Sequence, residues 1–384
     1  MPSVAAWLSA ASGRLTGRLV FQNKAVGRGE RGAFELPCLE NAASISLDLG
    51  FLGLALPPAG TFARLTGLFL IRVRLQGASA LGDLVSSPRC PSLRKLVVYN
   101  ARVPGNITIH SKSLLKMELR QLDGLQKFVI DARELKELRM LDCFSENRPT
   151  ADISAPRLVV LEFTDRYDPS SIQFGSMALL QQLATSFFLV YGPQGYANNR
   201  TILELLDRFR VIRELTFTLA IPPGIGNYLY LMEDITVLPR ISSLTLIVFN
   251  SGHTFGASVF HVLRNCTDLR SLTLRFDSTF KEFACPSGCI CEQPTSWKTD
   301  KHVLNCLEEV EITNMKVAEH EVVFMKQLFN WATVLKDMRV VFHCSITETK
   351  AWELHQTLSS ISGPEMCTKF YIQCGDPKLL HLLR

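Results

Sequence analysis

The sequence Leu93-Arg-Lys-Leu-Val-Val98 returns in similar form as Leu114-Leu-Lys-Met-Glu-Leu119, Leu135-Lys-Glu-Leu-Arg-Met140 and Leu158-Val-Val-Leu-Glu-Phe163. The starting positions of these four segments are spaced by 21, 21 and 23 residues. Each segment has apolar residues at its first, fourth and sixth positions, so that the last two are separated by a single residue. This alternation is typical of a β-strand, whose successive side chains point to opposite faces of a sheet. The stretch therefore predicts a regularly repeated strand.

The same pattern, with apolar substitutions, occurs on both sides of this stretch. Further copies begin at Leu65, Ile212, Ile241, Leu269, Leu307 and Leu335. A period of about 20 to 29 residues built on this pattern is the signature of leucine-rich repeats. One coil cannot bury its own apolar face, and stacking of neighbouring coils makes a continuous core. We therefore expect an α/β fold, a leucine-rich-repeat solenoid of horseshoe shape.

The return segments between the repeat strands differ between the two halves of the chain. In the first half, residues 106–110 and 125–130 read as short strands, which predicts strand–strand coils. In the second half, Thr201-Ile-Leu-Glu204 matches a capping box and is followed by apolar residues at helical spacing. Similar spacing occurs around residues 259–263 and 324–335. Strand–helix coils are therefore expected beyond about residue 200.

Composition excludes several classes of protein. The chain of 384 residues is 47% hydrophobic and 20% charged, as expected for a well-packed fold. Its net charge of +5 comes from scattered basic residues, which disfavours nucleic acid as a partner. The longest apolar run, residues 47–62, is interrupted by Asp48 and two prolines, so we expect no membrane span. Eleven dispersed cysteines and the lack of a secretory signal favour the cytoplasm or the nucleus.

Several segments, in their order, resemble the large grass family of F-box proteins with leucine-rich repeats and an FBD-like C-terminus. They are residues 31–38, 44–49, 87–93, 114–119, 153–156, 187–192, 307–312, 321–331 and 338–342. The resemblance covers roughly residues 5 to 375. It implies a leucine-rich-repeat solenoid over residues 1–300 and FBD-like repeats that continue the solenoid over residues 301–384.

In that family, an F-box docks onto a Skp-type adaptor of a cullin ubiquitin ligase, and the repeats hold a protein substrate. Residues 1–60 do not resemble the helical hairpin of an F-box, so the sequence is expected to begin after that domain. Adaptor and cullin are therefore expected partners only if an F-box lies upstream. The resemblance implies a protein–protein interaction module without enzymatic activity. The alternative is a stand-alone repeat protein or ligand sensor that is not linked to ubiquitination.

The candidate partner-binding residues are the outward positions of the repeat strands, on the concave side of the expected horseshoe. A shift of one residue in register would exchange this set with the buried one. The candidates are Lys95, Tyr99, Lys116, Glu118, Arg120, Glu137, Arg139, Glu162, Arg275, Glu309 and Glu311. Lateral pairs of opposite charge, such as Glu118 with Arg139, are also expected on this face.

The cysteines of Cys285-Pro-Ser-Gly-Cys289-Ile-Cys291 suggest a zinc site with Cys306 as a fourth ligand. Because this spacing lacks a second ligand pair, we favour free thiols in a Gly/Pro-rich loop and expect neither a metal nor a cofactor. The loop, residues 280–298, interrupts the repeats and is a further partner-contact candidate. Asp165 and the pair Glu308-Glu309 lack a nucleophile or an oriented histidine nearby in sequence, so no catalytic residue is assigned.

Overall fold

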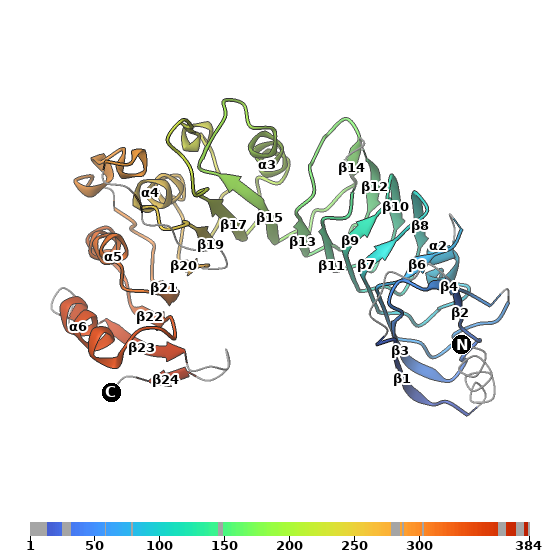
Figure 1. The fold of residues 1–384 in the computed structure, drawn as a ribbon. Coiled ribbons are helices and arrows are strands. Elements are labelled where there is room, and N and C mark those ends of the chain that lie inside the picture. The colour runs from blue at the N-terminus through green and yellow to red at the C-terminus, as the bar shows by residue number, and fades with distance from the viewer. Residues whose placement is uncertain are drawn as a thin grey trace. The chain divides into compact units, whose positions relative to one another are not determined.

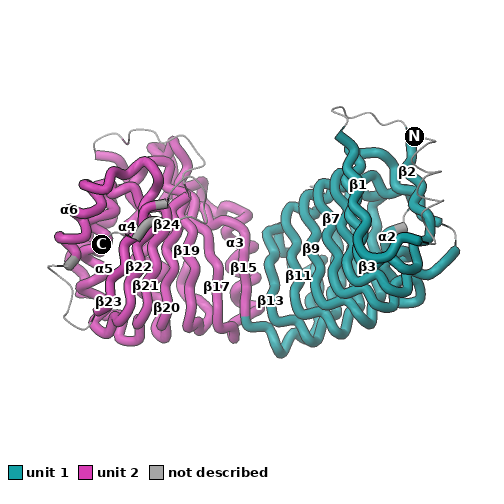
Figure 2. The backbone as a smooth tube through the Cα atoms, turned by 90° about the horizontal axis from the view of Figure 1, so that it is seen from below, with its two compact units in different colours: residues 1–181 teal, residues 182–384 magenta. Residues whose placement is uncertain are grey.

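The computed structural model describes residues 14–24, 32–57, 59–77, 80–144, 149–277, 285, 288–301, 303–359, 366–373 and 380–382. The chain divides into two compact units, unit 1 (residues 1–181) and unit 2 (residues 182–384), which Figure 2 colours separately. All ten repeat segments named above are found as strands, or as the entry into a strand.

The main sheet of unit 1 is parallel, and each repeat strand pairs with the strand of the next repeat (Figure 1). Leu96, Met117 and Leu138 are aligned in this register and are at most 1% exposed. Because aligned apolar residues stack from coil to coil, the core is continuous, as in a repeat solenoid. The strands are β1 (Gly17–Gln22), β3 (Ala42–Asp48), β5 (Gly67–Ile71), β7 (Lys95–Arg102), β9 (Lys116–Asp123), β11 (Glu137–Leu141) and β13 (Val160–Phe163).

Four successive coils of unit 1 turn at a corresponding residue with positive φ, two residues after the last inward residue of the strand. These residues are Arg72 (φ 47°), Asn100 (53°), Gln121 (52°) and Asp142 (52°). A left-handed residue is uncommon outside glycine, asparagine and aspartate. Its regular return shows that the repeat is a property of the backbone as well as of the apolar pattern.

The return segments of unit 1 are also largely strands. Phe128 and Ile130 point into the core from β10 and are at most 1% exposed. Four of these strands form a second parallel sheet, namely β8 (Asn106–His110), β10 (Lys127–Asp131), β12 (Thr150–Ser154) and β14 (Ile172–Phe174). Nearer the N-terminus lie the short strands β2 (Ala33–Glu35), β4 (Gly53–Ala55) and β6 (Arg74–Leu75) and the helix α2 (Ala80–Val85).

Unit 2 has a parallel sheet with helices in its return segments. Its strands are β15 (Gln182–Leu189), β17 (Glu214–Ala220), β19 (Ser243–Phe249), β20 (Ser271–Phe276), β21 (Glu309–Met315), β22 (Asp337–Phe342) and β23 (Cys367–Gln373), followed by the antiparallel β24 (Leu380–Leu382). The helices are α3 (Ala197–Arg208), α4 (Gly256–Arg264), α5 (Glu319–Trp331) and α6 (Glu348–Ser359). A two-residue pair joins β16 (Tyr191–Gly192) to β18 (Leu229–Tyr230). Short 3-10 turns lie at Met232–Asp234, Ile290–Glu292 and Ser296–Lys298.

The capping-box prediction at Thr201 is wrong, because α3 begins four residues earlier, at Ala197. Tertiary contacts fix its first turn. The Asn199 amide accepts a hydrogen bond from the Leu189 N–H and donates one to the Leu189 carbonyl, both at 2.8 Å. Thr201 lies inside the helix, where its hydroxyl donates to the carbonyl of Asn198 at 2.9 Å. The end of β15, rather than a local cap, sets where this helix starts.

The chain pairs β20 with β21 across the expected boundary at residue 300, in continuous parallel register. The division into 1–300 and 301–384 remains a prediction from the family resemblance. None of the helices formed by the described residues has the length and apolar character that crossing a bilayer requires.

Candidate functional site

The outward side chains of β5, β7, β9, β11 and β13 form one surface, which we call the unit 1 face. It holds eight of the predicted contact residues, and the strand register arranges them in three rows. All eight are exposed or part-exposed, whereas the inward residues that alternate with the outward ones in these strands are buried. The rows are Lys95–Lys116–Glu137, Val97–Glu118–Arg139–Glu162 and Tyr99–Arg120–Leu141.

Ion pairs connect the charged part of the unit 1 face. Lys116 pairs with Glu137 at 2.7 Å and Arg139 pairs with Glu162 at 3.2 Å, in each case across neighbouring strands. Glu118 accepts a hydrogen bond from Arg120 of its own strand at 2.5 Å, rather than pairing laterally with Arg139 as expected. Such part-exposed pairs contribute at most about 1 kcal/mol to stability, so a partner can compete for these groups.

The other part of the unit 1 face is apolar. Phe69, Ile71 and Val97 are part-exposed outward residues, and Tyr99 beside them is 40% exposed. The ammonium of Lys95 lies over the Phe69 ring, 5.4 Å from its centroid. An exposed aromatic and aliphatic cluster next to rows of mixed charge is a composition typical of protein-binding surfaces.

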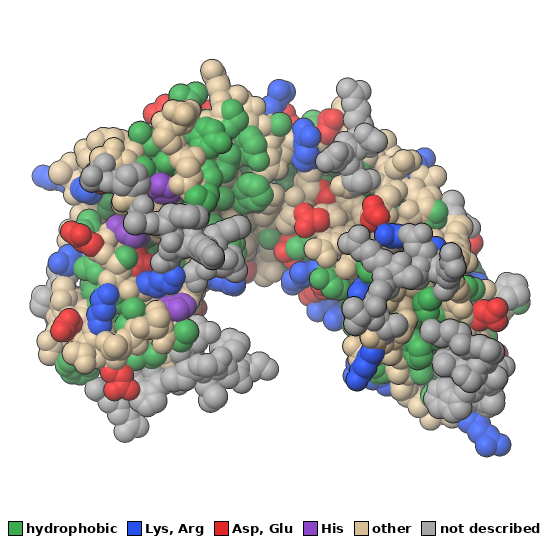
Figure 3. All heavy atoms as spheres, viewed as in Figure 1, with side chains coloured by type: hydrophobic (Ala, Val, Ile, Leu, Met, Phe, Trp, Pro, Cys, Tyr) green, Lys and Arg blue, Asp and Glu red, His purple; other side chains and the backbone are tan. Residues whose placement is uncertain are grey.

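The three remaining predicted residues lie on the exposed side of the sheet in unit 2. Arg275 is 3.6 Å from Asp277, and Glu311 pairs with Arg339 at 3.4 Å. Glu309 lies in register between Ser271 and Asp337, so its row is acidic. On the side drawn in Figure 3, acidic and basic side chains are interspersed rather than gathered by sign. This mixture gives no support to a basic stripe for nucleic acid.

Asp165 holds the backbone of the preceding coil through its carboxylate. Its Oδ1 accepts hydrogen bonds from the backbone N–H groups of Cys143 and Phe144, at 2.8 and 2.9 Å. Oδ2 is buried without a hydrogen-bond partner, and burial raises the pKa of this carboxyl from 3.8 to about 6. Glu308, one of the two adjacent acids also considered for chemistry, pairs with Lys336 at 3.3 Å. Both acids therefore have roles in the packing of neighbouring coils.

The raised pKa of Asp165 predicts a pH-dependent stability. The folded state favours the protonated carboxyl, so its contribution is full below pH about 4 and is lost as pH rises through about 6. A shift of this size corresponds to at most about 3 kcal/mol. In Asp165→Asn, the amide oxygen keeps both backbone hydrogen bonds and cannot ionise.

Urea unfolding from pH 4 to pH 7.5 checks this prediction. The stability of the variant relative to the natural chain should increase with pH, mainly between pH 4 and 7. A difference that stays constant over this range would contradict the assignment of a raised pKa to Asp165.

Unit 2 contains a cluster that the sequence did not reveal as a whole. One imidazole nitrogen of His253 and the thiols of Cys285, Cys289 and Cys291 all lie within 4.8 Å of one another. His253 and Cys291 are buried, and the other two are part-exposed. The predicted fourth member, Cys306, is not in the cluster. His253 precedes Cys285 by 32 residues, but it follows β19 as Cys285 follows β20, so the two loops belong to neighbouring coils.

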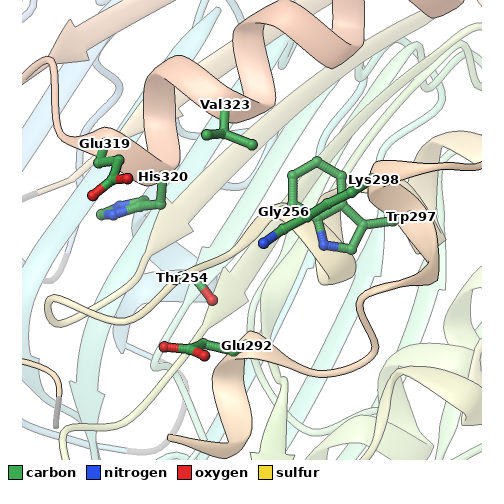
Figure 4. A pocket seen from close by; sticks show the side chains of 8 residues that line it. All are labelled: Thr254, Gly256, Glu292, Trp297, Lys298, Glu319, His320 and Val323. Atoms are coloured by element: carbon green, nitrogen blue, oxygen red, sulfur yellow. The ribbon is translucent and has the colours of Figure 1, made fainter. Parts of the chain in front are cut away.

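Unit 2 also has a depression, whose lining side chains are shown in Figure 4. It has a volume of about 330 Å³ and is lined by Thr254, Gly256, Glu292, Trp297, Lys298, Glu319, His320 and Val323. Two residues that line the depression, Thr254 and Glu292, directly follow the cluster residues His253 and Cys291 in the sequence. The same two segments therefore contribute to both the cluster and the depression. Residues 280–284 and 286–287 of the predicted contact loop lie outside the described residues.

Comparison with known proteins identifies the repeats. Residues 4–188 match the family described as FBD-associated F-box protein At5g56370, LRR repeats. A protein of Arabidopsis thaliana named as an F-box/FBD/LRR-repeat protein, At4g03220, is 26% identical over 144 residues. The match covers 35% of this chain and 28% of that protein, so the chain spans less than a third of the length of this relative. No solved structure matches the chain.

Proposed function

This chain is a plant F-box/leucine-rich-repeat-like protein, and on that premise we propose that it is a recognition module that binds a protein partner through the unit 1 face. The proposal includes the horseshoe curvature expected from the sequence, with the unit 1 face on its concave side. Stacked repeats of this kind present extended binding surfaces of which each coil supplies one strip.

The observation that carries the proposal is the composition of the unit 1 face. Tyr99 stands among apolar outward side chains, and Arg120 and Arg139 lie on the next two strands. Tyrosine and arginine are enriched among the residues that contribute most to protein–protein binding. Fixed strand register also presents these groups on a rigid support, which lowers the entropic cost of binding.

As a finer proposal, the module is the substrate-recognition part of an F-box ubiquitin-ligase receptor in the cytoplasm or nucleus. The name of the Arabidopsis relative includes an F-box. In the family that the sequence resembles, this domain docks onto a Skp-type adaptor of a cullin ubiquitin ligase. The FBD-like assignment of residues 301–384 is part of this proposal. The rival is a stand-alone repeat protein that binds its partner without ubiquitination.

Affinity purification of the tagged chain from plant cells tests the binding surface. The double variant Tyr99→Ala/Lys116→Ala removes two side chains of the unit 1 face. A matched control is Tyr228→Ala/Lys127→Ala, because Tyr228 has a similar exposed fraction, 42%, and Lys127 is an outward residue of the second sheet. For the face variant, we expect the amount of co-purified protein to fall about tenfold or more, which corresponds to a loss of about 1.4 kcal/mol in binding free energy. The control variant should co-purify the same amount as the natural chain.

Amine cross-linking adds a positional readout. Partner peptides should be linked to Lys95 and Lys116 of the unit 1 face and not to Lys127. Equal depletion by both double variants, with both folded, would overturn the assignment of the surface. The chain is purified both with and without an upstream F-box. Recovery of a Skp-type adaptor only with the F-box supports the ligase role. Partner binding with no adaptor recovered in either case supports the rival.

A further inference from the structure

We propose that His253, Cys285, Cys289 and Cys291 bind one structural zinc ion in unit 2. Three thiolates and one imidazole are a complete ligand set of the Cys₃His type found in structural zinc sites. The proposal is independent of the protein-binding function, because none of the four residues belongs to the unit 1 face.

The distances between the ligand atoms fit a tetrahedral zinc ion. The Nδ1 atom of His253 lies 3.2 Å from Cys285 Sγ and 3.6 Å from Cys289 Sγ. The sulfurs of Cys285 and Cys291 are 3.5 Å apart. Zinc–sulfur bonds of about 2.3 Å and a zinc–nitrogen bond of about 2.0–2.1 Å give tetrahedron edges of about 3.8 Å between sulfurs and about 3.6 Å between sulfur and nitrogen. Small adjustments of the side chains would therefore complete the site.

The far side of the imidazole supports the same assignment. The Nε2 atom of His253 is 3.0 Å from the carbonyl oxygen of Pro223, which can only accept a hydrogen bond. Nε2 must therefore carry the proton, so that in the neutral ring the lone pair is on Nδ1, directed at the cysteines. A metal-binding histidine typically donates its other N–H in this way to a backbone carbonyl, which fixes its tautomer and orientation.

The backbone holds His253 in place before any metal binds. Ser251 and Gly252 both have positive φ, 47° and 88°, and form a tight turn after β19. The His253 N–H donates to the carbonyl of Asn250 at 2.8 Å, and the Asn250 side chain donates back to the His253 carbonyl at 3.1 Å. The imidazole is thus preorganised, and the cysteine segment is the part that zinc would fix.

A disulfide is a weaker explanation of the cluster. A bond between Cys285 and Cys291 would not explain why the Cys289 thiol and the His253 imidazole lie in the same cluster. Thiolate-rich sites select zinc, copper(I) or iron over hard cations, and a closed set of four protein ligands is typical of structural zinc. Binding converts the three thiols to thiolates and releases their protons to solvent.

The zinc ion would fix the segment of residues 288–300, which we call the insertion and which packs on α4 and α5. The Thr254 hydroxyl donates to the Cys291 carbonyl at 2.5 Å. This hydrogen bond joins the residue after His253 to Cys291, and both His253 and Cys291 are proposed ligands. Further along, Trp297 is 5% exposed and lies so close to Gly256 that a Cβ atom there would come within 2.3 Å of its ring. Zinc would therefore stabilise the wall that carries Glu292 and Lys298 at the depression in Figure 4.

The test measures metal in the full chain, purified without a histidine tag, under reducing conditions and without chelator. Elemental analysis should find zinc in equimolar amount. Cys289→Ser and His253→Gln should lose it, with zinc affinity lowered by more than the roughly 10–100-fold that follows from changing a residue that only hydrogen-bonds to a ligand. Cys306→Ser is the matched control and should keep the metal, since Cys306 lies outside the cluster.

A second measurement covers variants that fail to fold. In the natural chain, cobalt(II) should replace zinc and give the visible absorption of a tetrahedral thiolate site, and chelation should lower the melting temperature reversibly. A folded natural chain that contains no zinc and gives no such cobalt spectrum would overturn the proposal. Retention of zinc by folded Cys289→Ser and His253→Gln together with its loss in Cys306→Ser would overturn the ligand assignment.

Discussion

Trp331→Ala is expected to lower the free energy of unfolding by about 3–5 kcal/mol, as for other fully buried tryptophans. Trp331 ends α5 and is 1% exposed. Its ring lies 4.7 Å from that of Phe260 in α4 and 6.3 Å from that of Trp297 in the insertion, measured between centroids. Its indole N–H donates to the Asp300 carbonyl at 3.2 Å. One truncation therefore leaves a cavity between two helices and removes a tie to the insertion.

Trp352→Ala is the matched control for this prediction. Trp352 lies in α6, is 39% exposed and stacks on His355 with 4.8 Å between ring centroids. Its loss should cost about 1 kcal/mol or less, as for most surface substitutions. Urea unfolding followed by circular dichroism gives both values, and hydrogen exchange should show the loss of protection in α4 and α5. Similar costs for the two variants would contradict the packing described for Trp331.

The repeat strands could be predicted because each coil packs mainly against its two neighbouring coils. An inward residue such as Leu96 contacts its equivalents one coil away, so the same apolar requirement returns at every turn and is written into the sequence as a period. The short strands predicted at residues 106–110 and 125–130 follow from the same alternation, and the structure has them at Asn106–His110 and Lys127–Asp131. Outward positions follow from the alternation once one inward position is known.

Features that depend on contacts between different elements could not be predicted in this way. The start of α3 is set by hydrogen bonds of Asn199 to Leu189 rather than by a cap near Thr201. The partner of Glu118 is Arg120 and not Arg139, since long charged side chains choose among rotamers of similar energy.

The cysteine cluster also depends on contacts between different elements, so sequence spacing alone did not give its full set of residues. A search for ligands near Cys285 in sequence suggested Cys306, whereas the structure supplies His253 from the preceding coil. In a solenoid, the loops that follow successive strands are spatial neighbours whatever the number of residues between them. Comparing equivalent positions of adjacent repeats, rather than sequence spacing alone, would have suggested the histidine.

The register of the unit 1 face leads to the second large expected effect, because two leucines of β11 differ only in the side of the sheet to which they point. Leu138 is fully buried and aligned with Met117 and Leu161 of the neighbouring strands. Leu141, three residues later, is part-exposed and aligned with Arg120. Leu138→Ala should cost about 2–5 kcal/mol, since it removes buried methyl groups and leaves a cavity that rigid neighbouring coils cannot fill.

Leu141→Ala should cost about 1 kcal/mol or less, because much of that side chain already contacts water. Urea unfolding of both variants at one pH measures the difference, and it uses the same substitution in the same strand. A register shifted by one residue would bring residues 137, 139 and 141 to the buried side and reverse the order of the two costs. A larger loss for Leu141→Ala would therefore place Glu137 and Arg139 in the core and remove the surface on which the proposed protein recognition depends.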